Sequence, residues 1–193
     1  MSEARASLFE LELEMYLKIQ KNLEIETVSL FVLIPEHVTE AYVSWLNAPD
    51  INQYLESRFA THNVDTTKSF VSNALASSEY VFLGIKSHLF NRHVGNIKLG
   101  PIDQRHGTGD IGLLIGDKAA WGSGVATTAI GMISDIAKNQ LNLRKLTSSC
   151  YASNVGSRRA FEKAGFVVEG LRPAQFLLNG IPEDMVLMGR LLK

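Results

Sequence analysis

The segment best suited to chemistry is a pair of glycines at the start of an amphipathic stretch. Gly122 and Gly124 flank Ser123, shortly after an apolar run that ends at Ile115. Glycine lets the backbone come close to a ligand, and the first turn of a helix offers bare N–H groups and the positive end of the helix dipole. The segment therefore predicts an anion site, and a pyrophosphate would suit it without any basic side chain.

Two familiar phosphate-binding patterns do not fit this turn. A P-loop requires Gly-Lys-Ser/Thr after a longer glycine spacing, and the chain has none. A dinucleotide-binding fold places its glycine turn after the first strand, with an acidic ribose ligand about 20 residues later. Here the turn follows several predicted antiparallel strands. Glycine before a helix is also common punctuation, so the turn alone does not identify the ligand.

Hydrophobic periodicity predicts the elements that position this turn. Strict alternation over 8–20 predicts a strand in an extra N-terminal segment, 8–22, and a second strand is expected over 23–34. One helix should start at Pro35, and Asp65 should cap another, with Phe70 and Val71 facing inward. Further strands are expected over 80–86, 94–102, 110–115, 145–151, 167–170 and 184–191, and further helices over 124–138 and 154–164.

This order predicts one α+β domain, 1–193, with a central, mainly antiparallel sheet and helices on both faces. The apolar run over 110–115 indicates a strand that is buried on both faces. Gly165 should end the helix over 154–164 in the left-handed conformation.

Composition narrows the function classes. The 193 residues carry a formal net charge of −1, with 19 basic and 20 acidic side chains and no basic tract, so nucleic acid is not an expected partner. The single cysteine, Cys150, and the spacing of the five histidines provide no metal site. We see no secretory signal and no apolar stretch of membrane-spanning length, so we expect no membrane partner and a cytoplasmic protein.

A second motif makes a family resemblance specific. Asn154 to Phe166, NVGSRRAFEKAGF, resembles the Asn-x-x-Ser…Glu-Lys-x-Gly-Phe motif of the GNAT superfamily of N-acetyltransferases. It follows the glycine turn at the separation found in that family. Trp45-Leu46-Asn47, Glu169-Gly170 and Asn179-Gly180 resemble the branch that contains the ribosomal-protein N-terminal acetyltransferases. The resemblance covers 27–193 and implies the GNAT fold.

The resemblance implies that acetyl-CoA is the co-substrate. It implies that the end of the predicted strand, Leu114, Ile115 and Gly116, pairs with the pantetheine arm. It also implies that Asn154 bonds the pantetheine region and that Ser157 lies near the thioester sulfur. The competing interpretations are a helix N-cap for Asn154 and an ordinary first-turn residue for Ser157. The backbone expected to hold the CoA pyrophosphate is that of Trp121, Gly122, Ser123, Gly124, Val125, Ala126 and Thr127.

Two positions depart from the family pattern. Phe161, which we also expect to contact the cofactor, stands where many members have a tyrosine that protonates the departing thiolate. A serine at the place of Ser157 can take that role in the resembling branch, so Ser157 is the predicted acid. Ala119 replaces the usual Arg or Gln at the start of the pyrophosphate loop, so backbone donors must carry more of the binding.

The family reaction needs a base, because an alkyl amine with a pKa near ~10.4 is mostly protonated at neutral pH. Asp110, Asp103, Glu169 and His106 are candidates, and we predict Asp110 as the catalytic one. For the acidic candidates a solvated charge at a strand end is the competing interpretation. Backbone N–H groups near a kink in the strand over 110–115 could stabilise the oxyanion.

The resemblance implies an N-acetyltransferase that uses direct attack by a primary amine in a ternary complex. The acceptor would be a small amine, an amino sugar or a protein N-terminus. The alternative is a catalytically silent GNAT-like module that binds CoA or a partner, which Phe161 favours. Trp45, Tyr54 and Phe59 either line the acceptor pocket or pack in the core. The extra strand over 8–22 suggests a homodimer.

Overall fold

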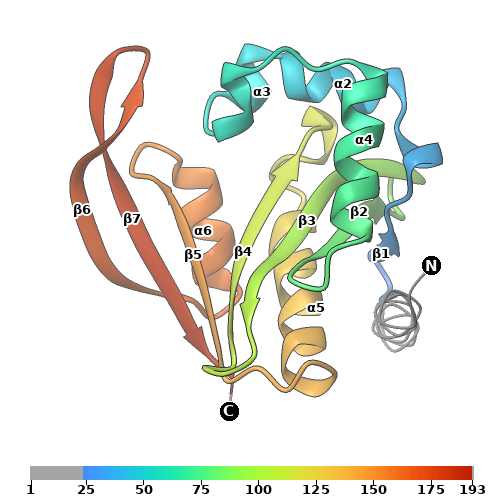
Figure 1. Ribbon diagram of the computed structural model, residues 1–193. Helices are drawn as coiled ribbons and strands as arrows, with labels where there is room; N and C mark the ends of the chain where they lie inside the picture. The colour runs from blue at the N-terminus through green and yellow to red at the C-terminus, as the bar shows by residue number, and fades with distance from the viewer. Residues whose placement is uncertain (1–23, 193) are drawn as a thin grey trace, which may run out of the picture.

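The computed structural model describes residues 24–192, which form a seven-stranded sheet with the order β1-β2-β3-β4-β5-β7-β6 (Figure 1). Every neighbouring pair is antiparallel except β4 and β5. The strands are β1 (Val28–Val32), β2 (Val81–Ser87), β3 (Arg92–Asp103), β4 (Thr108–Ile115), β5 (Lys145–Tyr151), β6 (Val167–Leu178) and β7 (Ile181–Leu191).

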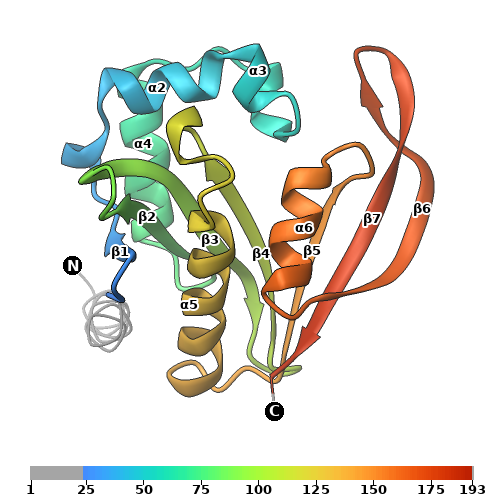
Figure 2. The same cartoon turned by 180° about the vertical axis from the view of Figure 1, so that it is seen from behind.

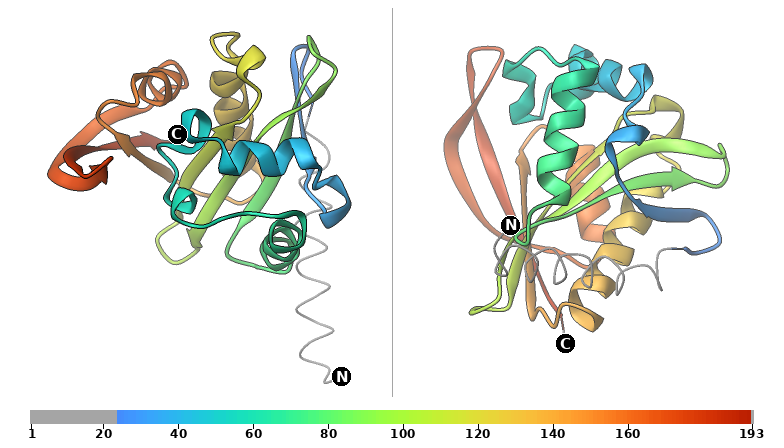
Figure 3. Two further views of the ribbon diagram at one scale, coloured as in Figure 1. Left: turned by 90° about the horizontal axis from the view of Figure 1, so that it is seen from above. Right: turned by 45° about the vertical axis from the view of Figure 1, so that its right-hand side comes forward.

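Helices cover both faces of the sheet, which confirms the predicted α+β architecture (Figures 1 and 2). In the view from above, α5 and α6 lie on one side of the strands and α2, α3 and α4 lie on the other (Figure 3). The helical segments are η2 (Pro35–His37), α2 (Glu40–Asn47), α3 (Pro49–Asn52), η3 (Glu56–Phe59), α4 (Val64–Leu75), η4 (Lys118–Ala120), α5 (Val125–Asn139) and α6 (Val155–Lys163).

The two faces hold separate apolar clusters. The larger one packs α5 and α6 on the sheet and includes Ile111, Ile130 and Ile133, each no more than 1% exposed. The smaller one packs α2 and α4 against the opposite face and includes Trp45 and Val71. Because side chains alternate along a strand, β1, β2 and β4 contribute to both clusters, and Phe31, Phe82 and Leu114 are their residues in the smaller one.

Among the strands of residues 24–192, the only parallel pairing is short, and it determines the shape of the sheet. β4 and β5 pair through Thr108, Gly109 and Asp110 on β4, and then diverge (Figure 1). We call the diverging segments, 111–115 of β4 and 148–151 of β5, the wedge. At its base the hydroxyl of Ser148 donates to the Ile111 carbonyl at 2.8 Å. This side-chain bond replaces a ladder bond where the strands part.

Several predicted elements are confirmed. β5 has the predicted limits, and Gly165 follows α6 with φ 89°, in the left-handed region. Asn154 is the N-cap of α6. The segment over 8–22, predicted as an extra strand, lies outside the described residues.

Other predictions were wrong in detail. Asn63, not Asp65, caps α4, because its side chain accepts the Thr66 amide at 2.8 Å. Phe70 does not face the core: it is 53% exposed, with its ring edge-on to Phe82. β6 extends to Leu178, far beyond 167–170, since β7 pairs with it along most of its length through two register shifts.

The strand over 110–115 is also not buried on both faces. Ile111 is buried, but Gly112 is exposed, and a Cβ added there would have no heavy atom within 4 Å. By alternation, Asp110, Gly112 and Leu114 face the side of α2 and α4, where Leu114 packs with Trp45's cluster. The sheet is therefore open above Gly112 on that side.

Trp45 joins α2 to the end of β4. Its indole lies where a Cβ on Gly116 would be, so only glycine fits at that position. We expect Gly116→Ala to lower the free energy of unfolding by about 1–3 kcal/mol through overpacking. Gly112→Ala on the same strand is the matched control and should be close to neutral in packing. Urea denaturation of both variants checks this, and an equal effect of the two would contradict the proposed contact.

Candidate active site

The loop between β4 and α5 is fixed by its own polar groups. Asp117 accepts the Ala119 amide at 3.0 Å and the Arg92 guanidinium at 2.6 Å, and this hydrogen bond with Arg92 lowers the pKa of Asp117. The indole N–H of Trp121 donates to the Ile115 carbonyl at 2.8 Å. Lys118 forms an ion pair with Asp50 of α3. The loop is thus tied to β3, to β4 and to the helices on the side of α2.

Its two glycines adopt backbone conformations that other residues rarely take. Gly122 has φ 73° and Gly124, the N-cap of α5, has φ 87°. A Cβ on either would meet no heavy atom within 4 Å, so neither glycine is required by crowding from the protein itself. The left-handed turn accounts for both residues, and it leaves the start of α5 uncovered.

The first turn of α5 offers free donors. No side chain caps Gly124, and the first bond of the helix runs from the Thr128 amide to the Gly124 carbonyl at 3.0 Å. Within residues 24–192, the amides of Val125, Ala126 and Thr127 have no protein acceptor. The Ser123 hydroxyl is turned inward and donates to the Ala120 carbonyl at 2.6 Å. Three bare amides at the positive end of a 15-residue helix form an anion site.

The second motif starts where β5 ends. The Asn154 side-chain oxygen accepts the Ser157 amide at 3.2 Å, as an N-cap does, and its NH₂ group has no partner in the described part of the chain. Ser157 lies in the first turn of α6 and is half-buried. Phe161 is 2% exposed and packs edge-on against Phe166 at 5.0 Å. The Phe161 side chain thus lies in the core, on the buried face of α6.

The family model described as "Acetyltransferase (GNAT) domain" matches residues 30–167, which is more than half of the chain. The chain belongs to the GNAT acetyltransferase family. A Bacillus subtilis protein named "Probable N-acetyltransferase YjcK" is 33% identical over 111 residues, 57% of this chain. The matched stretch spans 61% of that relative's length.

Solved structures show the same GNAT fold. The spermidine N-acetyltransferase from Vibrio cholerae, in complex with CoA and spermine, aligns with a TM-score of 0.76 and 21% identity, over 85% of this chain and 95% of that one. The microcin C7 self-immunity acetyltransferase MccE, in complex with acetyl-CoA and AMP, aligns with a TM-score of 0.75 and 19% identity, over 89% and 99%.

Of the four candidate proton acceptors, Asp110 lies where the wedge begins. Asp110 is the last β4 residue that pairs with β5, and its carboxylate accepts the Thr147 hydroxyl at 2.8 Å. Burial raises the pKa of Asp110, although the Thr147 hydrogen bond and the charge of Lys98 act in the opposite direction. A raised pKa makes a carboxylate a better proton acceptor near neutral pH.

The other three candidates have structural partners elsewhere. The backbone N–H of His106 and the Arg105 side chain bind Asp103 and lower its pKa, in the turn between β3 and β4. His106 lies in the same turn, where its carbonyl accepts from Arg144 at 2.7 Å. Glu169 receives the Lys145 ammonium at 2.7 and 2.8 Å. None of the three bonds to Asp110 in the described residues, but Glu169 lies against Gly189, which pairs with Thr147 across β5 and β7.

The aromatic residues predicted for the acceptor pocket have different positions. Trp45 is buried against Gly116, and Phe59 is 75% exposed with the Arg58 guanidinium over its ring at 4.2 Å. The Tyr54 ring lies 5.4 Å from that of Tyr151, at the open end of β5. Tyr54 thus lies beside the β5 end of the wedge, and Trp45 lies at its β4 end.

Sequence reasoning missed a polar cluster at this open end. The Tyr151 hydroxyl donates to the Glu56 carboxylate at 2.8 Å and accepts from Arg58 at 2.8 Å. Arg58 also donates to the Leu177 carbonyl at 3.0 Å, which ties η3 to the β6–β7 hairpin. Burial, and next the bond to Glu56, raise the pKa of Tyr151, so its hydroxyl stays protonated. The sequence predicted only that a strand ends at Tyr151, and nothing local indicated Glu56 or Arg58.

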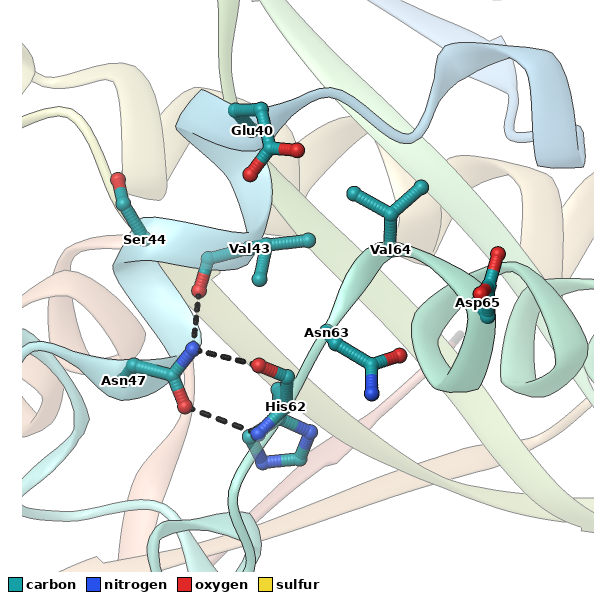
Figure 4. Close-up of a pocket in the computed structure, with 8 residues that line it drawn as sticks. All are labelled: Glu40, Val43, Ser44, Asn47, His62, Asn63, Val64 and Asp65. Atoms are coloured by element: carbon teal, nitrogen blue, oxygen red, sulfur yellow. Dashed lines mark hydrogen bonds between the residues drawn. The ribbon is translucent and has the colours of Figure 1, made fainter.

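A separate cavity of about 560 Å³ lies between α2 and the start of α4 (Figure 4). The Asn47 side chain crosses it, donating to the His62 carbonyl at 2.8 Å and accepting the His62 amide at 2.9 Å. Two carboxylates, Glu40 and Asp65, also line it. None of the residues predicted for cofactor binding or catalysis borders this cavity.

Among residues 24–192, no group of three His, Cys, Asp or Glu side chains is placed to hold a metal ion. None of the helices in the same range is both long enough and apolar enough to cross a bilayer.

The burial of Asp110 leads to opposite effects on stability and on catalysis. A carboxyl whose pKa is raised in the folded state destabilises that state once it is ionised in both states. Asp110→Asn should therefore raise the urea midpoint at pH 7, and the gain should shrink as the pH falls toward ~4. Turnover of any amine that the protein acetylates should fall about 10²–10⁴-fold if Asp110 is the base.

Asp103→Asn is the control, since hydrogen bonds lower the pKa of Asp103. This variant should not be more stable than the wild type at pH 7. A pH-independent gain for Asp110→Asn, or a gain of equal size for both variants, would contradict the role of burial at Asp110.

Proposed function

We propose that this GNAT protein transfers the acetyl group of acetyl-CoA to a primary amine. The observation that carries the proposal is the group of three bare amides at the glycine-opened end of α5, directly after the diverging strand β4. A diphosphate fits that donor set, and the wedge provides strand edges for an extended arm. The named N-acetyltransferase relative and the CoA-bound structures of similar fold support this proposal.

The cofactor residues follow from the loop geometry. The backbone from Gly122 to Thr127 would hold the pyrophosphate, and the end of β4 from Leu114 to Gly116 would lie beside the pantetheine arm. The Asn154 NH₂ group is the available donor on the opposite side of the wedge. Lys118, the one basic side chain in the loop over 116–127, is bound to Asp50. Binding would therefore rest on backbone donors, as the alanine at 119 implies.

The chemistry requires two proton transfers. The amine nitrogen attacks the thioester carbonyl carbon, the C–N bond forms and the C–S bond breaks. Asp110 would take the proton that the nitrogen loses, directly or through water, because it combines a raised pKa with a place at the base of the wedge. Ser157 would supply a proton to the leaving thiolate, since Phe161 has no hydroxyl and lies in the core.

The acceptor would approach from the side of α2, α3 and α4, where Gly112 leaves the sheet open. A small amine, an amino sugar and a protein N-terminus are the candidate acceptors, the last as in the ribosomal-protein branch. The similar structures include one named for spermidine and one for microcin immunity, so the fold accommodates different acceptors.

Pairing of two copies through 8–22 also stays a prediction, which light scattering tests.

The second candidate function is a silent module that binds CoA without turnover, and the observation that favours it is Phe161 in place of an acid. We expect release of free thiol from acetyl-CoA in the presence of at least one member of an amine and peptide panel. Tight CoA binding, measured by calorimetry, without thiol release from any acceptor would instead support the silent module.

The glycine at the N-cap of α5 provides a second test. Gly124→Ala should weaken acetyl-CoA binding about tenfold or more, because the methyl group strains a left-handed position and approaches the anion site. Gly180→Ala is the matched control: Gly180 has φ 79° and open space around it, but it lies in the β6–β7 turn. Both variants should lose similar stability. Equal acetyl-CoA affinities by calorimetry would contradict the site.

A further inference from the structure

Glu56 has an exposed carboxylate that the protein nevertheless holds in place. Its side chain is 65% exposed, yet one oxygen, Oε1, accepts the Tyr151 hydroxyl at 2.8 Å and lies 3.5 Å from Arg58. Tyr151 is 3% exposed and the Arg58 side chain 13%. Surface carboxylates ordinarily move among several rotamers. Fixing one in advance lowers the entropy lost when it binds a ligand.

Arg58 does not use up the charge of Glu56. Its short hydrogen bonds go to the Leu55 carbonyl at 2.8 Å, the Leu177 carbonyl at 3.0 Å and the Tyr151 hydroxyl at 2.8 Å. The contact with Glu56 is the longest of the four, at 3.5 Å. The other oxygen, Oε2, accepts no hydrogen bond from residues 24–192. The carboxylate therefore keeps the capacity to bind a cation.

The surroundings of Glu56 also suit a cation. Phe176 stacks on Tyr151 with ring centroids 4.1 Å apart, and Tyr54 lies beside them. The Arg58 guanidinium already lies over the Tyr151 ring at 5.3 Å, so Phe176 and Tyr54 are the rings that can attract a protonated nitrogen of a ligand. A second carboxylate, Glu183, accepts the Ser153 amide at 2.7 Å, and the Ser153 hydroxyl lies 3.3 Å from that of Tyr54. Aromatic rings and two carboxylates thus meet at the open end of the wedge.

We propose that Glu56 binds a protonated nitrogen of the acceptor other than the nitrogen that is acetylated. The inference rests on the proposed function and names the acceptor class: a molecule with at least two basic nitrogens. The reacting nitrogen must be neutral when it attacks, and its base, Asp110, pairs with Thr147 at the closed end. Thr147 and Tyr151 are four residues apart on β5, about 13 Å at ~3.3 Å per residue. A cation at Glu56 is therefore a second group.

The test compares acceptors with one and with two basic nitrogens. An alkyl monoamine, an alkyl diamine of similar length, and two peptides that differ by one lysine are assayed with wild type and Glu56→Gln. The substitution keeps an oxygen for Tyr151 but removes the charge. We expect the KM of the doubly basic acceptors to rise about tenfold, as for hydrogen bonds to charged groups, and kcat and the KM for acetyl-CoA to change less than about twofold.

Two more variants separate this role from general effects. Tyr151→Phe releases the carboxylate without removing its charge, so it should raise the same KM by a smaller factor. Glu40→Gln makes the same change of charge on an exposed residue of α2, in the cavity of Figure 4, and should leave all constants unchanged. Glu56→Gln can raise the KM of the diamine, of the lysine peptide or of both. The acceptor whose KM rises identifies the source of the second nitrogen.

The outcomes distinguish this inference from the proposed function. Acetylation of monoamine and diamine with equal KM in wild type and Glu56→Gln would overturn the role of Glu56 and leave the transferase intact. An effect of Glu40→Gln in place of Glu56→Gln would overturn it too. If no acceptor is acetylated, the proposed function fails, and calorimetry of diamine binding to the CoA-loaded protein then tests the role of Glu56. Diamine binding that Glu56→Gln weakens would support the site, and absence of binding would overturn it.

Discussion

The separation of β4 from β5 is the constraint on which the rest of the structure depends. Two parallel strands that start as neighbours normally continue the ladder, because each unpaired N–H and C=O in a sheet interior costs free energy. Here the ladder stops after Asp110 and Thr147. At that point the Thr147 hydroxyl donates to the Asp110 carboxylate and the Ser148 hydroxyl donates to the Ile111 carbonyl. These side-chain bonds join the two strands where the ladder ends. Beyond that point, the edges of β4 and β5 are available to pair with a ligand.

Other contacts keep the two halves apart. On the side of β4, the Trp45 indole lies on Gly116, and the Lys118–Asp50 ion pair ties the loop before α5 to α3. On the side of β5, Arg58 connects η3 to Tyr151 and to the β6–β7 hairpin. The segment from α2 to η3 therefore contacts both halves of the sheet across the wedge. Its position sets the width of the opening from the acceptor side.

The elements that sequence predicted well are those with local signals. β5 alternates in burial from Lys145 to Cys150, and α6 has an Asn cap at its start and a left-handed glycine at its end. Phe70 was placed wrongly because Phe70 and Val71 are adjacent in sequence and therefore point about 100° apart around the helix. Val71 faces the core, which leaves Phe70 at the edge of the apolar side. β6 was predicted too short because its length depends on pairing with β7 and on bulges near Gly170 and Phe176.

The same distinction applies to the site. The glycine turn and the Asn154 motif are contiguous in sequence, so the residues at the anion site could be named in advance. The group of Glu56, Arg58 and Tyr151 could not, because it joins positions 93 or more apart in a segment without regular periodicity. Only the tertiary contacts show that the irregular stretch after α3 has a defined conformation.

The position of Phe161 constrains how proton transfer can be arranged. The Phe161 ring is buried in the apolar layer and has no proton to donate. The raised pKa of Tyr151 keeps its hydroxyl protonated, but that hydroxyl already donates to Glu56. Under the proposed function, the proton for the leaving thiolate would come from Ser157 or from water near the start of α6. A serine hydroxyl is a weak acid, so it serves best by passing on a proton from solvent. Since Ser157 is half-buried, solvent can reach it, so the proposed reaction would not need a tyrosine at position 161.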